Sequence, residues 1–298
     1  MPKEKDASLI LQRGKPINSE KALNNKMKTK YGFSVSTLQN PFFSDLVKGM
    51  HKVLPSSMEL VVKDASENAY KQLEDIDELM ALEVKVMLIN PVDINLITPA
   101  INKLNKLNIP VIALARKPIS GRLESFIDMD DIKGSKQAGE YIAEHVEPNS
   151  KIAMLRGPRY LDCSKQRETG FLKGVKSKGS YTTVLSENSR FYSRDEGHRL
   201  MSKLLDEHKD LKGVFSCNDE MALGAIKAIK ERGKKIVIVG FDGIEEALKA
   251  IENGELDATI KTYPETMGAV AFATALKLSS NKKVDKLILT PTGLYEKG

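Results

Sequence analysis

The sequence predicts an α/β protein built from two doubly wound lobes, each formed around a parallel sheet. Two observations predict this fold class. Short apolar runs, nearly unbroken by polar residues, alternate with amphipathic helical patterns from Tyr31 onward, which is typical of a parallel sheet with helices on both faces. After residue 130 the alternation starts again on a similar plan, which indicates a second lobe of the same kind.

Local signals predict the first strand and helix. Residues 31–35 form a short apolar run that ends in polar residues, as a buried strand does. Asn40 is a favoured N-cap, and Pro41 stands at the first helical position, where proline is favoured. Phe42 and Phe43 then lie at the edge of the sheet where a ligand would bind. The alternative is that one Phe covers the core and that Asn40 only caps the helix.

The other elements of the first block follow in order. Strands are predicted at 58–62, 84–89, 111–114 and 126–129. Two helical patterns lie between them, carried by Tyr70, Leu73, Ile76, Leu79 and Met80, and by Ile97, Ile101, Leu104 and Leu107. Parallel strands need crossover connections, and a helix between successive strands provides one.

The second block repeats the pattern and is followed by an extra unit. Its strands are predicted at 151–155, 181–185, 213–216 and 236–239, and its helices at 132–146, 165–178, 194–208, 221–232 and 245–253. A strand at 258–260, a helix at 265–278 and a strand at 286–289 close the chain. Such an ending is typical of a chain that crosses back to its first lobe, although periodicity alone does not establish the crossing.

Length and composition bound the function. The chain has 298 residues, of which 41% are apolar and 29% charged, enough for two domains with their own cores. No apolar run is long enough to span a membrane, and Leu9-Ile10-Leu11 is too short for the apolar region of a signal peptide. The sequence therefore fits a cytoplasmic protein or the mature form of an exported one.

The positive charge is concentrated in the first 30 residues. They hold eight Lys and Arg against three Asp and Glu, which is +5 of the total of +6 and leaves +1 for the other 268 residues. The body is therefore not predicted to bind nucleic acid. Residues 1–30 are predicted to be a flexible basic tether, which could lie near an anionic membrane surface; a solvated arm without a role is the alternative.

Polar side chains follow strand after strand, at the carboxyl edge where ligands bind in open α/β sheets. They are Asn90, Arg116, Arg156, Tyr192, Asn218, Asp242 and Thr262, with Arg167 a little beyond its strand. Guanidinium and carboxylate groups can each form two hydrogen bonds, which suits a vicinal diol. Individually each has a structural alternative, such as a turn, an N-cap or an exposed ion pair. We do not expect all of these residues to be purely structural, because they lie at the same edge of the sheets.

The cysteines and histidines do not predict a metal or redox centre. Cys163 and Cys217 are the only cysteines, with no C-x-x-C spacing and no nearby histidine cluster. They are predicted to be two packed thiols, with a disulfide left open. Neither a metal nor a cofactor is expected, and no catalytic residue is identified, because the chain has no G-x-G-x-x-G, no phosphate loop and no nucleophile–base pairing.

Several segments together resemble one family. STLQNPFF, LINPVD, NIPVIALAR, RETGF, CNDEMALGA, VGFDG and the segment before Tyr263-Pro264 occur in order over residues 31–298. The chain resembles the ribose-binding-protein-like branch of the sugar-binding proteins of ABC transporters. The resemblance implies two lobes joined by three hinge crossings, near Asp130, Thr262 and Leu289, and a ligand cleft between the lobes. It divides the chain into 31–129 with 263–289, and 130–262 with 290–298.

The resemblance also implies the residues that bind the ligand. They are Asn40, Phe42, Phe43, Asn90 and Arg116 of the first lobe, Arg167, Tyr192, Asn218 and Asp242 of the second, and Thr262 of the hinge. The two Phe rings would cover one face of a sugar and Tyr192 the other, while the arginines, Asn218 and Asp242 would bond its hydroxyls. The chain departs from the family's ribose binders at Ala115, where they have Asp, at Thr262, where they have Gln, and at Tyr192, where Phe is common.

The implied function is that of a solute-binding protein that delivers a monosaccharide to a membrane permease. The departures favour a deoxy sugar, another pentose, a polyol or a ribose-like signalling molecule over plain ribose. The resemblance implies a monomer outside the cytoplasmic membrane, either periplasmic or lipid-anchored at the cell surface. The alternative is the effector-binding core of a LacI-type transcription regulator, for which residues 1–30 are too short to hold the DNA-binding module.

Overall fold

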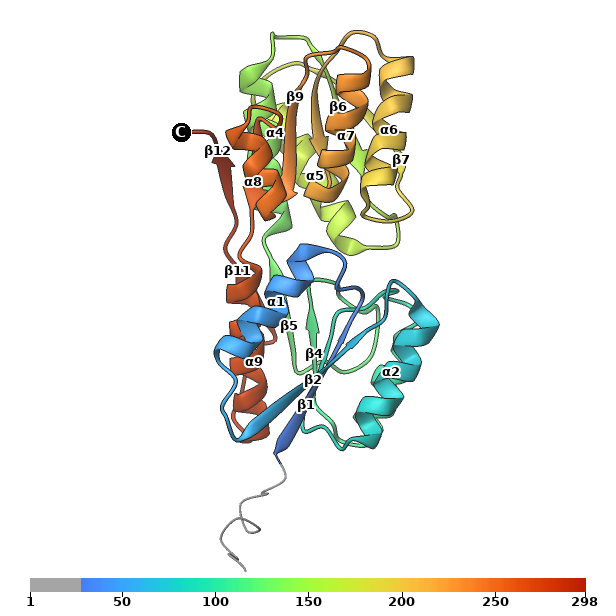
Figure 1. Ribbon diagram of the computed structural model, residues 1–298, viewed down its shortest axis with the longest axis vertical. Coiled ribbons are helices and arrows are strands. Elements are labelled where there is room, and N and C mark those ends of the chain that lie inside the picture. Colours follow the sequence, from blue (N-terminus) through green and yellow to red (C-terminus); the bar gives the residue numbers. More distant parts are fainter. Residues whose placement is uncertain (1–27) are drawn as a thin grey trace, which may run out of the picture.

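The computed structural model describes residues 28–298, which form two lobes stacked along the long axis of the molecule (Figure 1). The first lobe has a six-stranded parallel sheet in the order β11-β5-β4-β3-β1-β2. Its strands are β1 (Thr29–Val35), β2 (Met58–Asp64), β3 (Met87–Ile89), β4 (Val111–Leu114), β5 (Ser125–Met129) and β11 (Leu287–Thr290).

Helices cover both faces of this sheet. On one face α1 (Pro41–Lys52) and α9 (Pro264–Ser279) pack on Phe33 and Leu88. On the other face α2 (Ala69–Ala81) and α3 (Thr98–Lys106) pack on Met87 and Ile89. Because successive strand residues point to opposite faces, the short apolar run of β3 serves both cores. The predicted alternation of strands and helices is therefore confirmed.

The second lobe repeats the plan. Its sheet has the order β12-β10-β9-β8-β6-β7, with β12 antiparallel to β10. The strands are β6 (Lys151–Arg156), β7 (Thr182–Asn188), β8 (Leu211–Ser216), β9 (Val237–Asp242), β10 (Ala258–Lys261) and β12 (Gly293–Glu296). The helices are α4 (Asp131–His145) and α5 (Asp162–Ser177) on one face, and α6 (Arg194–Glu207), α7 (Asp219–Glu231) and α8 (Glu245–Glu252) on the other.

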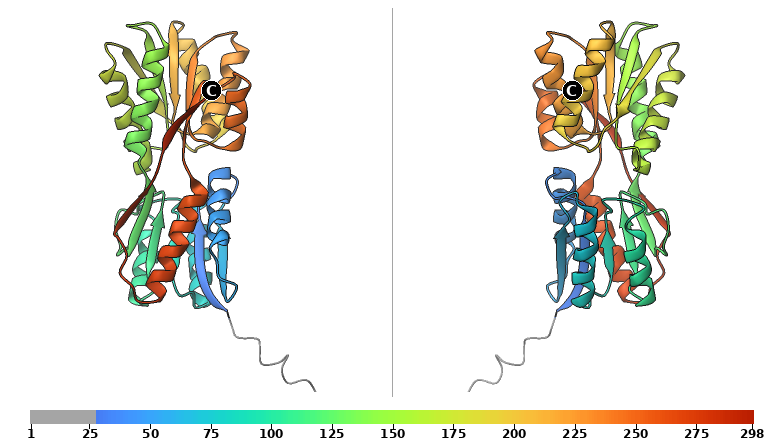
Figure 2. Two further views of the ribbon diagram at one scale, coloured as in Figure 1. Left: turned by 90° about the vertical axis from the view of Figure 1, so that its left-hand side faces the viewer. Right: turned by 90° about the vertical axis from the view of Figure 1, so that its right-hand side faces the viewer.

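The chain passes between the lobes three times, and the three segments run through the waist in Figure 2. The passages lie at Asp130, between β5 and α4; at Thr262, between β10 and α9; and after Thr290, between β11 and β12. The resemblance implies crossings near Asp130, Thr262 and Leu289; β11 continues through Thr290, which pairs with Met129.

The start of the first sheet and the last strand differ from the predictions. The sheet takes in Thr29 and Lys30, which the predicted tether includes, while residues 1–27 of that tether lie outside the described residues. Strand β12 is not predicted, because four residues beginning with Gly293 and ending with Glu296 give little local signal; their pairing with β10 makes them a strand. Within residues 28–298, no helix is long and apolar enough to cross a membrane.

Helices α1 and α9 pack so closely that only glycine fits at their contact. A Cβ built on Gly49 would lie 1.9 Å from the carbonyl oxygen of Glu265, and one on Gly268 would lie 1.9 Å from that of Leu46. Backbone atoms cannot rotate away as a side chain can, so the helices would have to separate. This contact holds α1, and with it Phe42 and Phe43, at a fixed height over the sheet.

We expect Gly49→Ala to lower the free energy of unfolding by about 1–3 kcal/mol through overpacking, measured as a lower urea midpoint with an unchanged slope. Gly293→Ala is the matched control, because a Cβ there meets nothing within 4 Å. Equal midpoints for the two variants would contradict the close contact between α1 and α9.

Candidate ligand-binding site

A cavity with about 380 Å³ of empty space lies between the lobes, where the carboxyl ends of both sheets meet. It brings together eight of the ten residues predicted from the sequence: Asn40, Phe42, Phe43, Arg116, Arg167, Tyr192, Asn218 and Asp242. Ala115, Met129 and Cys163 complete the lining.

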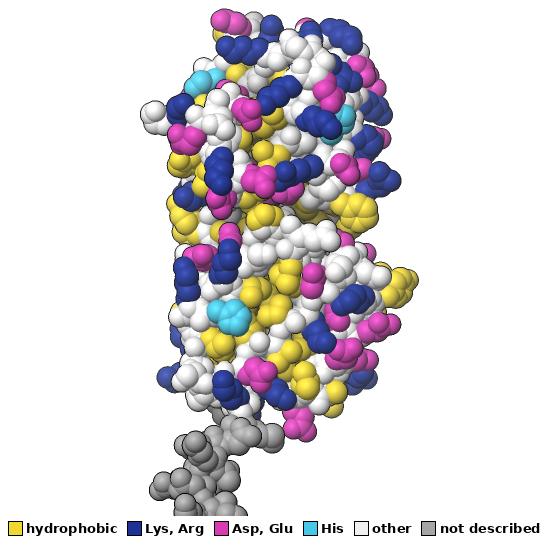
Figure 3. Space-filling view, viewed as in Figure 1, with side chains coloured by type: hydrophobic (Ala, Val, Ile, Leu, Met, Phe, Trp, Pro, Cys, Tyr) yellow, Lys and Arg dark blue, Asp and Glu magenta, His cyan; other side chains and the backbone are white. Residues whose placement is uncertain are grey.

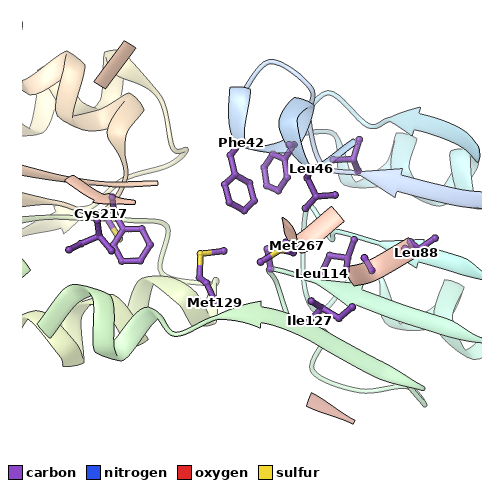
Figure 4. Close-up of a cluster of buried hydrophobic side chains, with 14 of the residues drawn as sticks. Phe42, Leu46, Leu88, Leu114, Ile127, Met129, Cys217 and Met267 are labelled. Atoms are coloured by element: carbon purple, nitrogen blue, oxygen red, sulfur yellow. The ribbon is translucent and has the colours of Figure 1, made fainter. Parts of the chain in front are cut away.

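The first helix turn places the two Phe rings. The Oδ1 of Asn40 accepts the backbone N–H of Phe42 at 3.0 Å and so begins α1, with Pro41 in the first turn. The rings of Phe42 and Phe43 are buried and perpendicular, with centroids 5.1 Å apart. Figure 4 shows Phe42 and Met129 facing Cys217 of the second lobe. Asn40 therefore caps the helix and also lines the cavity.

Arg116 reaches the cavity from a strained turn. Ala115 has a φ of 56°, in the left-handed region that costs an L-residue about 1–2 kcal/mol. The buried guanidinium of Arg116 donates from Nη1 to the carbonyl of Pro91 at 2.9 Å and lies 3.7 Å from Glu67 Oε1. It also lies 5.6 Å from the centroid of the Phe43 ring. The turn thus fixes the arginine at the wall instead of leaving it in solvent.

Arg167 is the buried cation of the second lobe. Its Nε donates to Asp131 Oδ1 at 2.7 Å, and its Nη1 donates to the carbonyl of Cys217 at 2.6 Å. The guanidinium stacks 3.7 Å from the centroid of Phe241. Burial disfavours its charge, but Asp131 and Asp242 outweigh burial and raise the pKa of Arg167. It is not the exposed ion-pair partner that the alternative interpretation suggested.

Asp242 ends β9 with its carboxylate in the cavity. Among residues 28–298 its only close cationic neighbour is Arg167, whose Nη1 lies 3.6 Å from Oδ1. Burial raises the pKa of Asp242 well above its usual range, and the charge of Arg167 opposes that shift. The backbone φ of Asp242 is 124°, a conformation that L-residues rarely adopt. Strain of this kind is maintained by its surroundings and concentrates at functional sites.

Asn218 divides its amide between structure and cavity. Its Oδ1 accepts the backbone N–H of Met221 at 3.0 Å and caps α7. Its Nδ2 is buried and has no hydrogen-bond partner among residues 28–298. An unpaired buried donor costs about 1–3 kcal/mol, so this group is available for a ligand acceptor.

Tyr192 is anchored inside its own lobe, between the two cysteines. Its hydroxyl lies 2.7 Å from Ser164 Oγ, 3.5 Å from Cys163 Sγ and 3.6 Å from Cys217 Sγ. Both cysteines are free and buried. Burial raises the pKa of Tyr192, and it raises the pKa of Cys163 to about 12. These are packed thiols, since neither one is ionised at neutral pH.

Asn90 and Thr262 do not line the cavity, because the backbone uses their polar atoms. Asn90 donates from Nδ2 to the carbonyl of Leu114 at 2.9 Å and accepts from the N–H of Ser36 at 3.3 Å. Thr262 donates from Oγ1 to the carbonyl of Asp242 at 2.8 Å. In this conformation both side chains hold strand ends in place, and neighbouring residues project from those strand ends into the cavity.

The sequence reasoning missed Met129 and Cys163. Met129 ends β5, at the carboxyl edge where ligands bind, so its position in the sequence was a usable signal. It was missed because the prediction considered polar side chains alone. Cys163 stands four residues before Arg167 on α5, hence on the same helix face. Within residues 28–298, no group of three His, Cys, Asp or Glu side chains is arranged to hold a metal ion.

Comparison with known proteins identifies the family. The sequence pattern of the periplasmic binding protein domain matches residues 31–283. The chain belongs to this family. The ribose import binding protein RbsB of Bacillus subtilis is 36% identical to this periplasmic binding protein, over 95% of this chain and 91% of the relative. The Escherichia coli protein of the same name is 36% identical, over 90% of each chain.

Solved structures agree. A solute-binding protein of an ABC transporter from Mycobacterium smegmatis, with bound glycerol, is 30% identical, has a TM-score of 0.85 and covers 91% of this chain and 94% of its own. The predicted family and fold are therefore confirmed. Because the relatives are transport binding proteins, the expectation that this periplasmic binding protein is not an enzyme is also confirmed.

We expect Asp242→Asn to stabilise the protein at neutral pH. Because burial holds the pKa of Asp242 above its unfolded value, the folded protein binds this proton more tightly. The free energy of unfolding of the wild type therefore falls as pH rises from about 4 through the raised pKa. The variant has no carboxyl to titrate at this position. Its free energy of unfolding should therefore exceed that of the wild type increasingly over this pH range, and the two should be equal below it. Urea unfolding from pH 3 to 8 measures both; a wild type that is the more stable at pH 7 would contradict this.

Proposed function

We propose that the protein captures a monosaccharide between its lobes and delivers it to the permease of an ABC transporter. One observation carries the proposal: the cavity presents polar groups without partners between aromatic rings. The Nδ2 of Asn218 has no partner among residues 28–298, and Asp242 has only Arg167 at 3.6 Å. Sugar hydroxyls both donate and accept, so they can satisfy the carboxylate and the amide together.

The rings provide the rest of the fit. Phe42 and Phe43 cover one C–H face of the sugar, and Tyr192 covers the other. Arg116, Arg167, Asn218 and Asp242 bond the hydroxyls, and Asn40 lies at the rim. Asn90 and Thr262 remain in the proposed site. They hold the strand ends in this conformation, and they would reach the ligand after a change of conformation on binding.

The relatives support this class of function. The two proteins at 36% identity are ribose import binding proteins, and the expected role as the substrate-binding protein of a sugar transporter is confirmed by them. A D-ribose/D-allose-binding protein of Pseudomonas aeruginosa is 25% identical over 90% of this chain. Because the relatives of this protein are transport proteins, we set aside the alternative that it is the effector-binding core of a transcription regulator.

The mechanism is closure about the hinge. The bodies that move are the two lobes, predicted as 31–129 with 263–289 and 130–262 with 290–298; Thr29, Lys30 and Thr290 belong to the first, since they pair in its sheet. The two lobes already touch, since Ile94 packs on Leu161 and Cys163 across the cleft. A ligand that contacts both lobes binds the closed form more tightly than the open one, and this difference in affinity shifts the equilibrium toward closure.

The lining favours a ligand other than plain ribose. Ala115, Met129 and Cys163 are lining residues without a charged acceptor, so part of the wall is less polar. The family's ribose binders have Asp at the position of Ala115, so a ribose hydroxyl bound there would lose a strong hydrogen bond. A deoxy sugar, another pentose, a polyol or a ribose-like signalling molecule fits this wall better.

Partners and location follow from the class. Periplasmic binding proteins of ABC importers are exported, so the protein acts outside the cytoplasmic membrane, in the periplasm or anchored by a lipid at the cell surface. We propose a monomer that binds no nucleic acid. In support, basic and acidic side chains are interspersed over both lobes on the face in Figure 3, with no single-sign patch there.

A thermal-shift screen against pentoses, deoxypentoses, hexoses and polyols tests the proposal. A ligand at one hundred times its dissociation constant stabilises by about 2.7 kcal/mol, which gives a clear rise in melting temperature. A strong shift with one sugar, and recovery of that sugar unchanged, supports a binding protein. If no member of the panel shifts the melting temperature, the assignment of a sugar to this cavity fails.

Asn218→Ser should weaken sugar binding about 10- to 100-fold, because serine keeps the cap of α7 but loses the donor in the cavity. Calorimetric titration measures the affinity. Asn68→Ser is the matched control: Asn68 caps α2 in the same way, away from the cavity. If the two variants bind the sugar equally well, the free amide of Asn218 does not contact it.

Ala115→Asp should raise the affinity for D-ribose at least tenfold, because a charged acceptor contributes about 1.5–3 kcal/mol and Asp tolerates the left-handed conformation of this position. Ala115→Asn is the control for size, and its gain should be smaller. A wild type that binds ribose as tightly as Ala115→Asp would show that Ala115 does not set the choice of sugar.

A further inference from the structure

A second and larger hollow adjoins the cavity at the mouth of the cleft. We name it the outer pocket; it holds about 860 Å³ of empty space. Asn40, Arg116 and Tyr192 line both the outer pocket and the inner cavity. Glu67 of the first lobe, and Phe191 and Glu220 of the second, stand on the remaining walls. The outer pocket therefore adjoins the inner site and offers space for a second group.

We propose that the outer pocket binds a hydroxyl- or amino-bearing substituent of the sugar, so that the preferred ligand is a monosaccharide that carries such a substituent. The inference rests on the proposed function and deepens it by naming the substrate class. The inner cavity holds the sugar ring, and the substituent extends past Arg116 and Tyr192 into the outer pocket.

Phe191 is the first observation that supports an occupant. Its neighbour Tyr192 turns inward, where Ser164 holds its hydroxyl at 2.7 Å. Phe191 turns the other way and leaves 50% of its surface exposed at the mouth. A flat ring or an apolar edge of a substituent would cover this aromatic surface, as aromatic side chains do at sugar and base sites.

The turn that carries Glu67 is the second observation. Ser66 and Glu67 both have left-handed backbones, with φ of 50° and 57°. Each such residue costs about 1–2 kcal/mol, and neither is glycine. This strained turn places the carboxylate of Glu67 on the pocket wall, 3.7 Å from Arg116. Strain that the fold maintains next to a cleft is typical of ligand-holding segments.

The charges on the two walls indicate the kind of substituent. Glu67 approaches from the first lobe and Glu220 from the second, where Arg194 holds Glu220 at 2.8 Å. Arg116 is bonded to Pro91 and faces Glu67, and Arg194 is bonded to both oxygens of Glu220, so the charged groups on the two walls are already paired. Thr37, Gln39 and Ser193 add neutral polar groups to the lining. Hydroxyl and amino groups donate to carboxylates, whereas a phosphate or carboxylate substituent meets like charge.

Calorimetric titration of the full chain tests the inference. The parent probes are D-ribose, 2-deoxy-D-ribose and D-xylose, and the substituted probes are methyl β-D-ribofuranoside, adenosine, xylobiose and ribose 5-phosphate. We expect at least one uncharged substituted probe to bind as tightly as its parent or more tightly. Ribose 5-phosphate should bind at least tenfold more weakly than ribose.

Variants separate the pocket from closure. Phe191→Ser should weaken the substituted probe at least fivefold and the parent less than twofold. Tyr70→Ser is the control, since Tyr70 is 70% exposed on α2 and lines neither hollow; it should change neither affinity.

Three outcomes would overturn the inference. Parents that bind while every substituted probe fails would show that the outer pocket is a water-filled entrance. Equal weakening of parent and substituted probe by Phe191→Ser would assign Phe191 to closure of the lobes. If neither parents nor substituted probes bind, the proposed function itself fails, and the loss of the parent sugars distinguishes this outcome from the first two.

Discussion

The buried guanidinium of Arg167 is the interaction on which the rest of the site depends. It joins the start of α4 at Asp131, the end of β8 at Cys217 and the cavity carboxylate of Asp242. Asp131 directly follows the first hinge crossing, so one side chain links the hinge to the ligand wall. Removing Arg167 would leave the buried carboxylates of Asp131 and Asp242 without their cation, at a cost of about 3–5 kcal/mol, so Arg167 supports the fold as well as the site.

The cavity is maintained at the expense of stability. Ala115 and Asp242 have backbones that L-residues disfavour, the pKa of Asp242 is raised by burial, and one amide donor of Asn218 lacks a partner among residues 28–298. These costs are offset by the two sheets, whose strands are buried on both faces by packed helices. A ligand that satisfies Asp242 and Asn218 recovers part of the cost.

The internal geometry of each half of the site is held within its own lobe. The phenylalanines depend on the tight contact of α1 and α9, and Arg116 depends on Pro91, all within the first lobe. Tyr192, Asn218 and Arg167 are held within the second lobe or at its junction with the hinge. Each wall is therefore preorganised before closure, so binding does not have to order individual side chains, which keeps the entropy cost of binding low.

The sequence by itself determined the fold class and most of the cavity. Apolar runs fix buried strands, N-caps such as Asn40 and Asn218 fix helix starts, and the carboxyl ends of parallel strands meet at one edge, so the residues that follow the strands gather there. These features depend on local interactions or on the general geometry of parallel sheets, so the sequence is enough to predict them. Only the tertiary structure decided which way each side chain points and what it bonds. Asn90 faces Leu114, 24 residues away, β12 becomes a strand by pairing with β10, and Cys163 and Met129 enter the wall. The outer pocket also exists only where the lobes approach. Such outcomes depend on contacts between residues far apart in the chain, and no local pattern encodes them.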